Sequence, residues 1–490
     1  MSNNLNILFV TSEADPFAKT GGLADVSSAL PQMIREIGHE IRLMMPRYGS
    51  ISDRKFKIHD VIRLKEIPIP VGNETKLTSI NSSFIANLKI KVQVYFLSNK
   101  ELFNRDGLYA SKKNQVEFKD NDERFIFFCR GVLETLKRLG WQPDIIHCND
   151  WQTGLIPAYL KTIYADDPFF KNIKSIFTIH NLAYQGIFPA SSFDKTHLPK
   201  SIFNEDGVSS NGKLNFMKAG IAFADIVTTV SDKYAKEICS PNKFNYGLED
   251  YLSKRKEKIV GILNGIDFNV WNPETDPFIS KRYNIKSIEG KNANKFELLE
   301  KFGLKAESNV PVFGMVTRLV ALKGLELIEQ IADKFFKENV RFVILGSGEV
   351  KYQKIFEKIK KKFPQKISFI NAFDEELAHL VEAGSDIYLM PSECEPCGLN
   401  QMYSVRYGTI PIVRGTGGLD DTIIDVSKPH GTGFKFEKYK PEDLYSAIKR
   451  ALTLYKNTKK WQTIMRNGMM QNFSWEASAK KYISLYRKSI

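Results

Sequence analysis

Residues 19–26, Lys-Thr-Gly-Gly-Leu-Ala-Asp-Val, lie between a strand-like run and a helix-like segment. The run before them, 6–10, is apolar, and the segment after them repeats apolar residues at helical spacing. Two adjacent glycines let the backbone approach a bulky anion, and the first N–H groups of a helix point at such an anion. Lys19 adds a positive charge there. The stretch predicts an anion-binding loop of an α/β fold, although a tight turn with a solvated lysine explains the same residues.

The same pattern occurs again near the other end of the chain. Residues 410–414 are strand-like, and residues 415–421 read Gly-Thr-Gly-Gly-Leu-Asp-Asp. Two such turns, roughly four hundred residues apart, indicate two α/β halves that face one cleft. We expect Asp420 and Asp421 to cap a helix rather than to bind a metal ion.

The first stretch resembles the Lys-Thr-Gly-Gly-Leu signature of the bacterial glycogen synthases and plant starch synthases. These are glucan-elongating transferases with two Rossmann-like domains, the GT-B architecture. The resemblance implies an acceptor-side domain over residues 1–262 and a nucleotide-sugar-binding domain over 263–474. It also implies that a terminal helix, 475–490, returns to the first domain.

Composition is that of a globular protein. The chain has 490 residues, 43% hydrophobic and 26% charged, which predicts two or three domains. The amino end lacks the layout of a signal peptide, and no apolar run reaches the roughly 18 residues that span a membrane. Five cysteines make no disulfide framework, and the Cys-x-x-Cys at 394–397 lacks partners for zinc, although redox sensitivity is possible. We expect a cytoplasmic protein that does not bind a membrane.

The net charge of +14 suits an anionic ligand or a nucleic acid. The densest basic cluster, in 354–362, comes at the end of a helix-like segment, where lysines favour the helix dipole. We therefore interpret it as a solvated helix end. Because the chain has neither an Arg-rich arm nor a recognisable reader motif, we expect no nucleic-acid partner.

Several apolar runs predict buried strands. In the first half these runs are 144–148, 175–179 and 225–230, and each ends in polar residues. Ligands of open α/β sheets bind at the carboxyl ends of strands, so these polar residues are candidates by position. The region from 46 to about 86 is expected to be irregular. The second half contains further strand-like runs at 311–317, 341–345, 367–370, 386–390 and 409–413, after a linker-like segment, 264–277.

Two cations follow the first strand of the second half. Arg318 comes at its end and Lys323 opens the next helix, which suits a diphosphate, although Arg318 paired with a carboxylate is an alternative. The resemblance is more specific here, because the spacing matches the family's Arg-x-x-x-x-Lys-Gly motif. The resemblance implies that these cations hold the pyrophosphate of the sugar nucleotide. These cations can neutralise the departing diphosphate without a metal ion.

Residues 393–399, Glu-Cys-Glu-Pro-Cys-Gly-Leu, resemble the family's Glu-Pro-Cys-Gly-Leu loop. The resemblance implies that Glu395 accepts hydrogen bonds from sugar hydroxyls, and that Cys397, Gly398 and Leu399 contribute to binding. Glu395 as a helix cap is the alternative. The family usually has a basic or neutral residue where this chain has Glu393.

Residues 180–186, His-Asn-Leu-Ala-Tyr-Gln-Gly, match a further family motif. The resemblance implies that His180 contacts the transferred glucose near its reacting carbon, and that Asp150 lines the same face. A lone histidine at a strand end is also commonly structural. Trp151 and Tyr184 could stack on a glucan, although each residue type is often in the core. The other substrate contacts that the resemblance implies are Lys19, Gly22, Asp25, Tyr109, Asn264, Thr416, Gly417 and Gly418.

The resemblance implies a retaining glucosyltransferase that moves glucose from ADP-glucose to the non-reducing 4-hydroxyl of an α-1,4-glucan such as glycogen. The catalytic set would be His180, Glu395, Arg318, Lys323 and Asp150. No metal ion or other cofactor is expected. The alternatives are UDP-glucose as donor, a different acceptor, glucan phosphorolysis, and a non-catalytic glucan-binding or nucleic-acid-binding protein.

Overall fold

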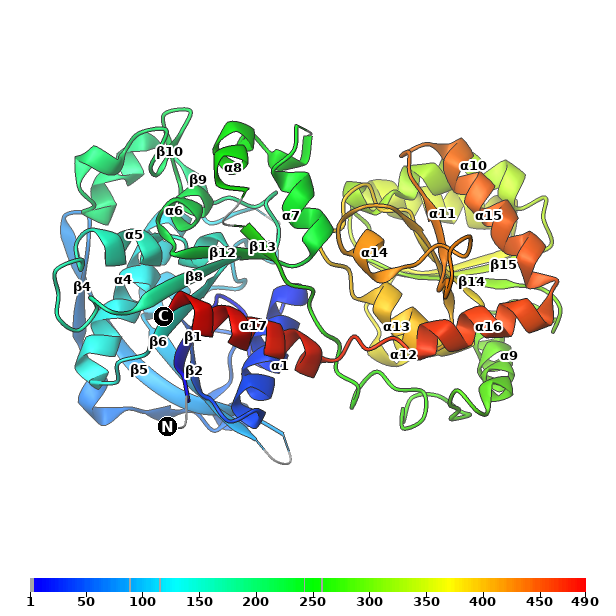
Figure 1. The fold of residues 1–490 in the computed structure, drawn as a ribbon, viewed down its shortest axis with the longest axis horizontal. Helices are drawn as coiled ribbons and strands as arrows, with labels where there is room; N and C mark the ends of the chain where they lie inside the picture. Colours follow the sequence, from blue (N-terminus) through cyan, green and yellow to red (C-terminus); the bar gives the residue numbers. More distant parts are fainter. Residues whose placement is uncertain (1–3, 88–89, 114–115, 242, 257–258) are drawn as a thin grey trace. The chain divides into compact units, whose positions relative to one another are not determined.

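The computed structural model describes residues 4–87, 90–113, 116–241, 243–256 and 259–490. The chain divides into a first unit of Met1–Val230, Ala235–Ile262 and Trp475–Ile490 and a second unit of Ser231–Tyr234 and Leu263–Ser474. Each unit is a mainly parallel sheet covered by helices (Figure 1).

The large sheet of the first unit has the strand order β13-β12-β8-β7-β1-β2-β6-β5-β3, and β4 pairs with β5. Its strands are β1 Asn6–Val10, β2 Glu40–Pro46, β3 His59–Asp60, β4 Ile67–Val71, β5 Glu74–Ala86, β6 Lys91–Ser98, β7 Ile145–Asn149, β8 Lys174–Ile179, β12 Ile226–Thr229 and β13 Ile259–Gly261. A small antiparallel sheet adds β9 Ile187–Phe188, β10 Ser209–Ser210 and β11 Lys213–Asn215. The strands from β13 to β6 are parallel, and the central ones are almost wholly buried, because helices cover both faces of such a sheet.

The expectation of an irregular region before Ala86 is wrong. β4 and β5 form an antiparallel hairpin in which Val71 pairs with Glu74, so the turn is Gly72–Asn73. Gly72 has a φ of +57°, as a two-residue hairpin turn requires. Two prolines in β4 obscured the strand pattern, and they are tolerated because β4 is an edge strand.

Helices of the first unit lie on both sides of its sheet (Figure 1). They are α1 Gly22–Glu36, α2 Asp53–Phe56, α3 Lys100–Phe103, α4 Asn121–Leu139, α5 Leu155–Lys161, α6 Phe216–Phe223, α8 Glu249–Arg255, α17 Trp475–Ser489 and the part of α7 Asp232–Ile238 that begins at Ala235. The C-terminal helix α17 packs beside α1, and the Tyr486 hydroxyl lies 2.7 Å from His147 Nδ1 on β7. The predicted return of this helix to the first domain is confirmed.

The sheet of the second unit is entirely parallel, with the order β16-β15-β14-β17-β18-β19. Its elements are β14 Val312–Val316, β15 Arg341–Leu345, β16 Ile367–Ile370, β17 Ile387–Met390, β18 Ile410–Arg414, β19 Phe434–Phe436, α9 Lys291–Lys301, α10 Leu325–Phe335, α11 Val350–Lys362, α12 Glu375–Gly384, α13 Asn400–Arg406, α14 Gly417–Thr422, α15 Pro441–Tyr455 and α16 Thr458–Met469. Alternate residues of β14 enter two cores, with Phe313 in one and Val312 in the other. The strand order reverses between β14 and β17, and ligands of open α/β sheets bind beside such a switch point.

The segment 264–277, predicted as a linker, packs firmly on the second unit. The Trp271 ring is stacked against His379 and Tyr403, with ring centroids 3.8 Å and 3.9 Å away. Asp276 accepts a hydrogen bond from the Tyr407 hydroxyl at 2.5 Å. The segment is therefore part of the second unit's body rather than a free tether.

No described helix combines the length and apolarity that a membrane crossing requires.

Candidate active site

Glu13 organises the glycine loop that follows β1. The backbone N–H and the hydroxyl of Thr20 both donate to its carboxylate, at 2.5 and 2.6 Å. The Tyr109 hydroxyl donates to the same carboxylate at 2.8 Å. Sequence reasoning missed Glu13, and the available signal was an acidic residue in the polar loop that follows a buried strand. The predicted substrate contact of Tyr109 stays a prediction, and in this structure its hydroxyl holds the loop.

The loop contains an ion pair and a stretch of uncovered backbone. Lys19 Nζ lies 2.5 Å from a carboxylate oxygen of Asp25, in the first turn of α1. Burial raises the pKa of Asp25, and the Lys19 charge opposes that rise. A Cβ added at Gly21 would meet no atom within 4 Å, so the backbone there is open to an incoming group. The predicted anion contacts of Lys19 and Gly22 fit this arrangement and stay predictions.

Asp150 joins the carboxyl ends of β7 and β8. Its carboxylate accepts the His180 N–H at 2.8 Å, and its own N–H donates to the Thr178 carbonyl at 2.9 Å. Asp150 has a φ of +57°, which is strained for a residue with a side chain and is typical of functional sites. Burial raises the pKa of Asp150 to about 7. The structure thus brings Asp150 and His180 together at one edge of the sheet, and their predicted contacts with glucose stay predictions.

His180 is held as a neutral ring. Its Nε2 lies 2.9 Å from Asn149 Oδ1, while the Asn149 amide donates to the Val10 carbonyl at 3.0 Å. An amide oxygen only accepts, so Nε2 carries the proton and Nδ1 remains an acceptor. Burial lowers the pKa of His180 to about 3. The ring can therefore accept a hydrogen bond from a sugar hydroxyl.

The two aromatic candidates for glucan stacking differ in exposure. Trp151 is buried among the rings of Phe125 and Phe216, and a Cβ at Gly186 would lie 2.3 Å from its indole. Trp151 is therefore a core residue. Tyr184 is 58% exposed and can still present a ring face to a sugar.

At the switch point of the second unit, Arg318 and Lys323 follow the carboxyl end of β14. Arg318 is exposed, and its guanidinium makes no hydrogen bond or ion pair with any residue that the structure describes. The alternative that Arg318 pairs with a carboxylate therefore finds no support in the described part of the chain. Lys323 Nζ lies 2.6 Å from Glu395 Oε2, which also accepts the Ser392 hydroxyl at 3.0 Å. Lys323 and Glu395 therefore place a cation and a carboxylate acceptor side by side at this edge of the sheet.

The loop that carries Glu395 is held from several sides. Arg414 donates to the carbonyls of Ser392 and Glu393, and the Glu393 N–H donates to the Leu322 carbonyl at 2.8 Å. The Gln401 amide donates to the Cys397 and Gly398 carbonyls at 3.0 and 3.1 Å. The loop is thus preorganised by contacts within the second unit. Glu395 makes no cap hydrogen bond to α13, whose first residue is Asn400.

The second glycine turn fits against the same loop. A Cβ at Gly417 would lie 2.0 Å from the Glu395 carbonyl, and one at Gly418 would lie 2.0 Å from the Cys397 carbonyl. The Gly418 N–H donates to the carbonyls of Glu395 and Pro396, each at 3.1 Å. Gly417 and Gly418 therefore let the turn approach the Glu395 loop closely. Their predicted substrate contacts, with that of Thr416, stay predictions.

The expectation that Asp420 and Asp421 cap the helix after the glycine turn is wrong, although Asp421 does accept a hydrogen bond from the first turn of another helix, α7. Both lie inside α14, and its N-cap residue, Thr416, makes no side-chain cap bond. Asp420 instead pairs with Lys435, and Asp421 accepts the Lys233 N–H at 2.8 Å.

Asn264 contributes an unsatisfied acceptor near this loop. Its Oδ1 is buried and has no hydrogen-bond partner among the described residues, which costs roughly 1–3 kcal/mol unless a water or ligand supplies one. Burial raises the pKa of the nearby Cys397 thiol to about 12, and the N–H groups of Asn264 oppose that rise. Asn264 thus has an acceptor available for a hydroxyl donor, as its predicted role requires.

Phe373 is a candidate that sequence reasoning missed. It follows the carboxyl end of β16, at the same edge of the sheet as Arg318, and its side chain is 88% exposed. A large exposed ring at a ligand-binding edge indicates a surface for stacking. The available signal was a phenylalanine after a predicted strand, just before the acidic start of a helix.

Two Rossmann-like units whose strand ends carry these polar groups define a glycosyltransferase of the GT-B type. Residues 6–254 match the starch synthase catalytic domain family, and residues 297–467 match glycosyl transferases group 1. The chain belongs to the glycogen synthase and starch synthase family.

Relatives of known name match along the whole chain. The glycogen synthases of Koribacter versatilis and Syntrophotalea carbinolica are 43% and 41% identical over 99% of this chain and 98% and 99% of theirs. The catalytic domain of starch synthase IV from Arabidopsis thaliana, solved with ADP and acarbose, has a TM-score of 0.89 at 33% identity, with 99% of both chains covered. A sucrose-phosphate synthase from Thermosynechococcus elongatus, 17% identical with a TM-score of 0.61 and 99% of both chains covered, shares the fold.

Proposed function

We propose that the protein transfers glucose from ADP-glucose to the non-reducing 4-hydroxyl of an α-1,4-glucan, with retention at the anomeric carbon. The observation that carries the proposal is the placement of Arg318, Lys323 and Glu395 at the switch point of the second unit. The ADP bound to the Arabidopsis relative supports the donor class, and the names of the bacterial relatives support the acceptor.

In the proposed reaction, the bond between glucose C1 and the β-phosphate oxygen breaks, and its electron pair leaves with ADP. Arg318 and Lys323 neutralise the charge that develops on the diphosphate. The acceptor O4 attacks C1 on the face that ADP leaves, and its proton passes to the departing diphosphate. Glu395 and His180 accept hydrogen bonds from glucose hydroxyls. In this scheme the protein supplies no nucleophile, and no metal ion is required.

The cytoplasmic location expected from the sequence belongs to the same proposal. None of the five cysteines, all of which lie in the described part of the chain, forms a disulfide, and Cys394 and Cys397 of the Glu395 loop are buried. Cysteines that form no disulfide suit a reducing compartment.

The test offers labelled ADP-glucose or UDP-glucose to the protein with glycogen, with and without EDTA, and counts polymer-bound label. We expect incorporation from ADP-glucose that EDTA leaves unchanged and that α-1,4-specific hydrolysis releases. Incorporation from UDP-glucose alone would overturn the donor assignment. Activity that EDTA abolishes and Mg²⁺ restores would overturn the metal-free mechanism.

A further inference from the structure

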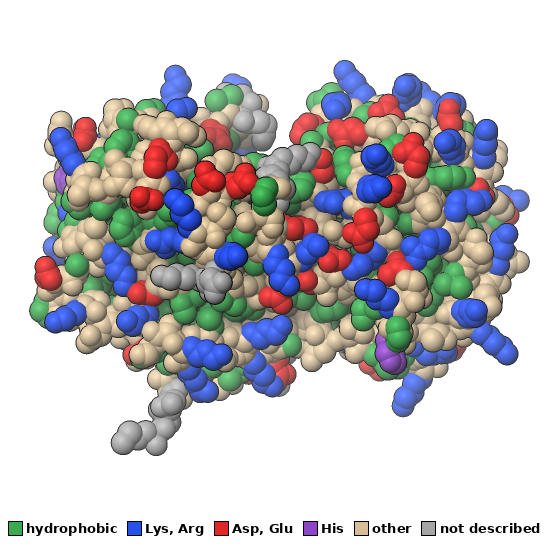
Figure 2. All heavy atoms as spheres, turned by 45° about the horizontal axis from the view of Figure 1, so that its top comes forward, with side chains coloured by type: hydrophobic (Ala, Val, Ile, Leu, Met, Phe, Trp, Pro, Cys, Tyr) green, Lys and Arg blue, Asp and Glu red, His purple; other side chains and the backbone are tan. Residues whose placement is uncertain are grey.

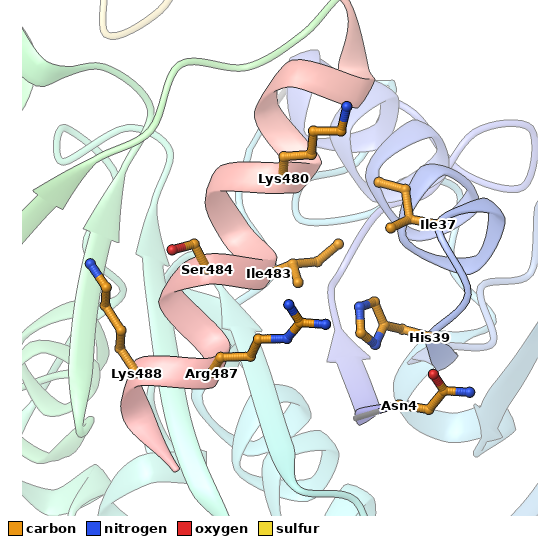
Figure 3. A pocket seen from close by; sticks show the side chains of 8 residues that line it. All are labelled: Asn4, Ile37, His39, Lys480, Ile483, Ser484, Arg487 and Lys488. Carbon is orange, nitrogen blue, oxygen red and sulfur yellow. The ribbon is translucent and has the colours of Figure 1, made fainter. Parts of the chain in front are cut away.

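A cavity of about 450 Å³ lies in the first unit between α17 and the end of α1 (Figure 3). It is lined by Asn4, Ile37, His39, Lys480, Ile483, Ser484, Arg487 and Lys488. Its volume is in the range of small-molecule sites, roughly 300–1,000 Å³. None of the candidate active-site residues lines it.

Two hydrogen-bond donors face each other in this cavity. His39 is 3% exposed, and its Nδ1 accepts the Leu5 N–H at 3.0 Å, which leaves the proton of the neutral ring on Nε2. The Arg487 side chain extends toward this ring (Figure 3), and its guanidinium makes no hydrogen bond or ion pair with the described part of the chain. Burial and the Arg487 charge lower the pKa of His39. An anion between the two groups would accept from both and remove their repulsion.

The other residues that line the cavity add positive charge at its rim and apolar surface on its walls. The lining residues of α17 recur at helical spacing along one face of the helix, from Lys480 to Lys488. Lys480 pairs with Glu476 at 2.6 Å, and Lys488 points away from His39, so both add positive potential at the rim rather than direct contacts. Ile37 and Ile483 supply apolar walls. The cavity therefore suits one phosphate group attached to a carbon skeleton.

We propose that this cavity between α17 and the end of α1 binds a small phosphate monoester, separately from the sugar-nucleotide site. The phosphate would lie between Arg487 and His39, and the carbon skeleton would cover Ile37 and Ile483. The occupant would join two elements that reach the active site. α1 begins at the Lys19 loop, and α17 is hydrogen-bonded through Tyr486 to His147 on β7, the strand that leads to Asp150.

The test is a binding titration with glucose 6-phosphate, adenosine monophosphate and inorganic phosphate, with the sugar-nucleotide site saturated by ADP. Calorimetry gives affinity and stoichiometry, and the His39 ring resonances, assigned through His39→Gln, report on the cavity. We expect one monoester per chain, a shift of the His39 resonances, and affinity at least tenfold weaker in Arg487→Gln. Lys481→Gln is the matched control, because Lys481 is an exposed cation of α17 outside the cavity lining. It should bind normally.

The two monoesters distinguish the source of the phosphate group. Tighter binding of glucose 6-phosphate indicates a sugar phosphate as the occupant, and tighter binding of adenosine monophosphate indicates a nucleotide. Inorganic phosphate that binds as tightly as both would overturn the role given to the apolar walls. Binding that Arg487→Gln leaves unchanged, or no binding by any probe, would overturn the site. A His39 shift with RNA or an acidic peptide but not with a monoester would also contradict it.

Discussion

Arg318 offers a clean test at the sugar-nucleotide site, because removal of its exposed side chain leaves no described group without a partner. We expect Arg318→Ala to lower kcat by about 10²-fold, the loss seen when a preorganised charge contact to a transition state is removed. Lys361→Ala, which removes an exposed cation of α11, should leave kcat unchanged. Steady-state kinetics with ADP-glucose and glycogen measure both, and near-normal turnover in Arg318→Ala would refute the assignment.

Lys323→Ala should cost at least as much activity, but its interpretation needs a second measurement. Lys323 neutralises Glu395, which is 8% exposed, so its loss leaves a buried carboxylate unpaired. The free energy of unfolding of this variant therefore falls as well. Lys323→Ala combined with Glu395→Gln should recover stability, and its turnover should still be lower than that of Glu395→Gln alone. Equal turnover in those two variants would contradict a role for Lys323 at the diphosphate.

Phe373 should act on donor binding rather than on chemistry. If its exposed ring stacks on the adenine, Phe373→Ala raises KM for ADP-glucose about tenfold or more, since stacking of a base on an aromatic ring contributes roughly 1–3 kcal/mol. kcat should change little. Val350→Ala, which shortens another exposed apolar side chain, serves as the control. An unchanged KM would remove Phe373 from the site.

Single residues were predictable where a local motif carries them and not where distant partners define them. Short motifs beside strand ends singled out Arg318, Lys323 and Glu395 as candidates, and the structure pairs Lys323 with Glu395. Glu13 was missed because one of its partners, Tyr109, lies 96 residues along the chain.

At the scale of elements, the contact between the α14 turn and the Glu395 loop depends on the absence of side chains. Gly417→Ala adds a Cβ 2.0 Å from the Glu395 carbonyl at a φ of +44°. We expect it to lower the free energy of unfolding by more than about 2 kcal/mol and to reduce kcat, because the loop must move. Gly303→Ala has a φ of +67° and open space around it, so it isolates backbone strain. It should cost about 1 kcal/mol and no activity. Equal costs in the two variants would refute the steric account.

The contact between β7 and α17 predicts a pH-dependent stability. Burial lowers the pKa of His147 to about 3, so below about pH 6.5 the unfolded chain binds a proton that the folded chain does not. Stability from this group is complete above pH 6.5 and declines as the pH falls toward 3. The loss at pH 5 should be about 2 kcal/mol.

Urea unfolding at pH 8 and pH 5 measures this effect. The difference in the free energy of unfolding between pH 8 and pH 5 should be smaller by about 2 kcal/mol in His147→Gln. It should stay unchanged in His59→Gln, because His59 is exposed in the same unit. An equal difference in wild type and His147→Gln would contradict the account.

The elements show what sequence patterns could and could not predict. The buried parallel strands and α17 were predicted within a few residues, because long apolar runs and helical periodicity are local. The β4–β5 hairpin was missed because Pro68 and Pro70 suggested irregular chain. The packing of 264–277 was also missed, because the Trp271 stack depends on residues more than 100 positions away.

For the whole molecule, the charge of +14 is spread rather than gathered on the face drawn in Figure 2. Lys and Arg side chains there alternate with Asp and Glu over both units. Such mixing suits a few local anion sites better than a continuous nucleic-acid track. This favours the enzyme interpretation, which family membership supports.

The central claim is that the cations after β14 hold the diphosphate of the donor while Glu395 faces the hexose. The most direct measurement is a crystal structure of the protein with ADP and glucose bound. We predict diphosphate oxygens within hydrogen-bond distance of Arg318 and Lys323, and glucose hydroxyls within reach of Glu395. The anion contact predicted for Lys19 would be read from the same map. A diphosphate bound away from both Arg318 and Lys323 would contradict the claim.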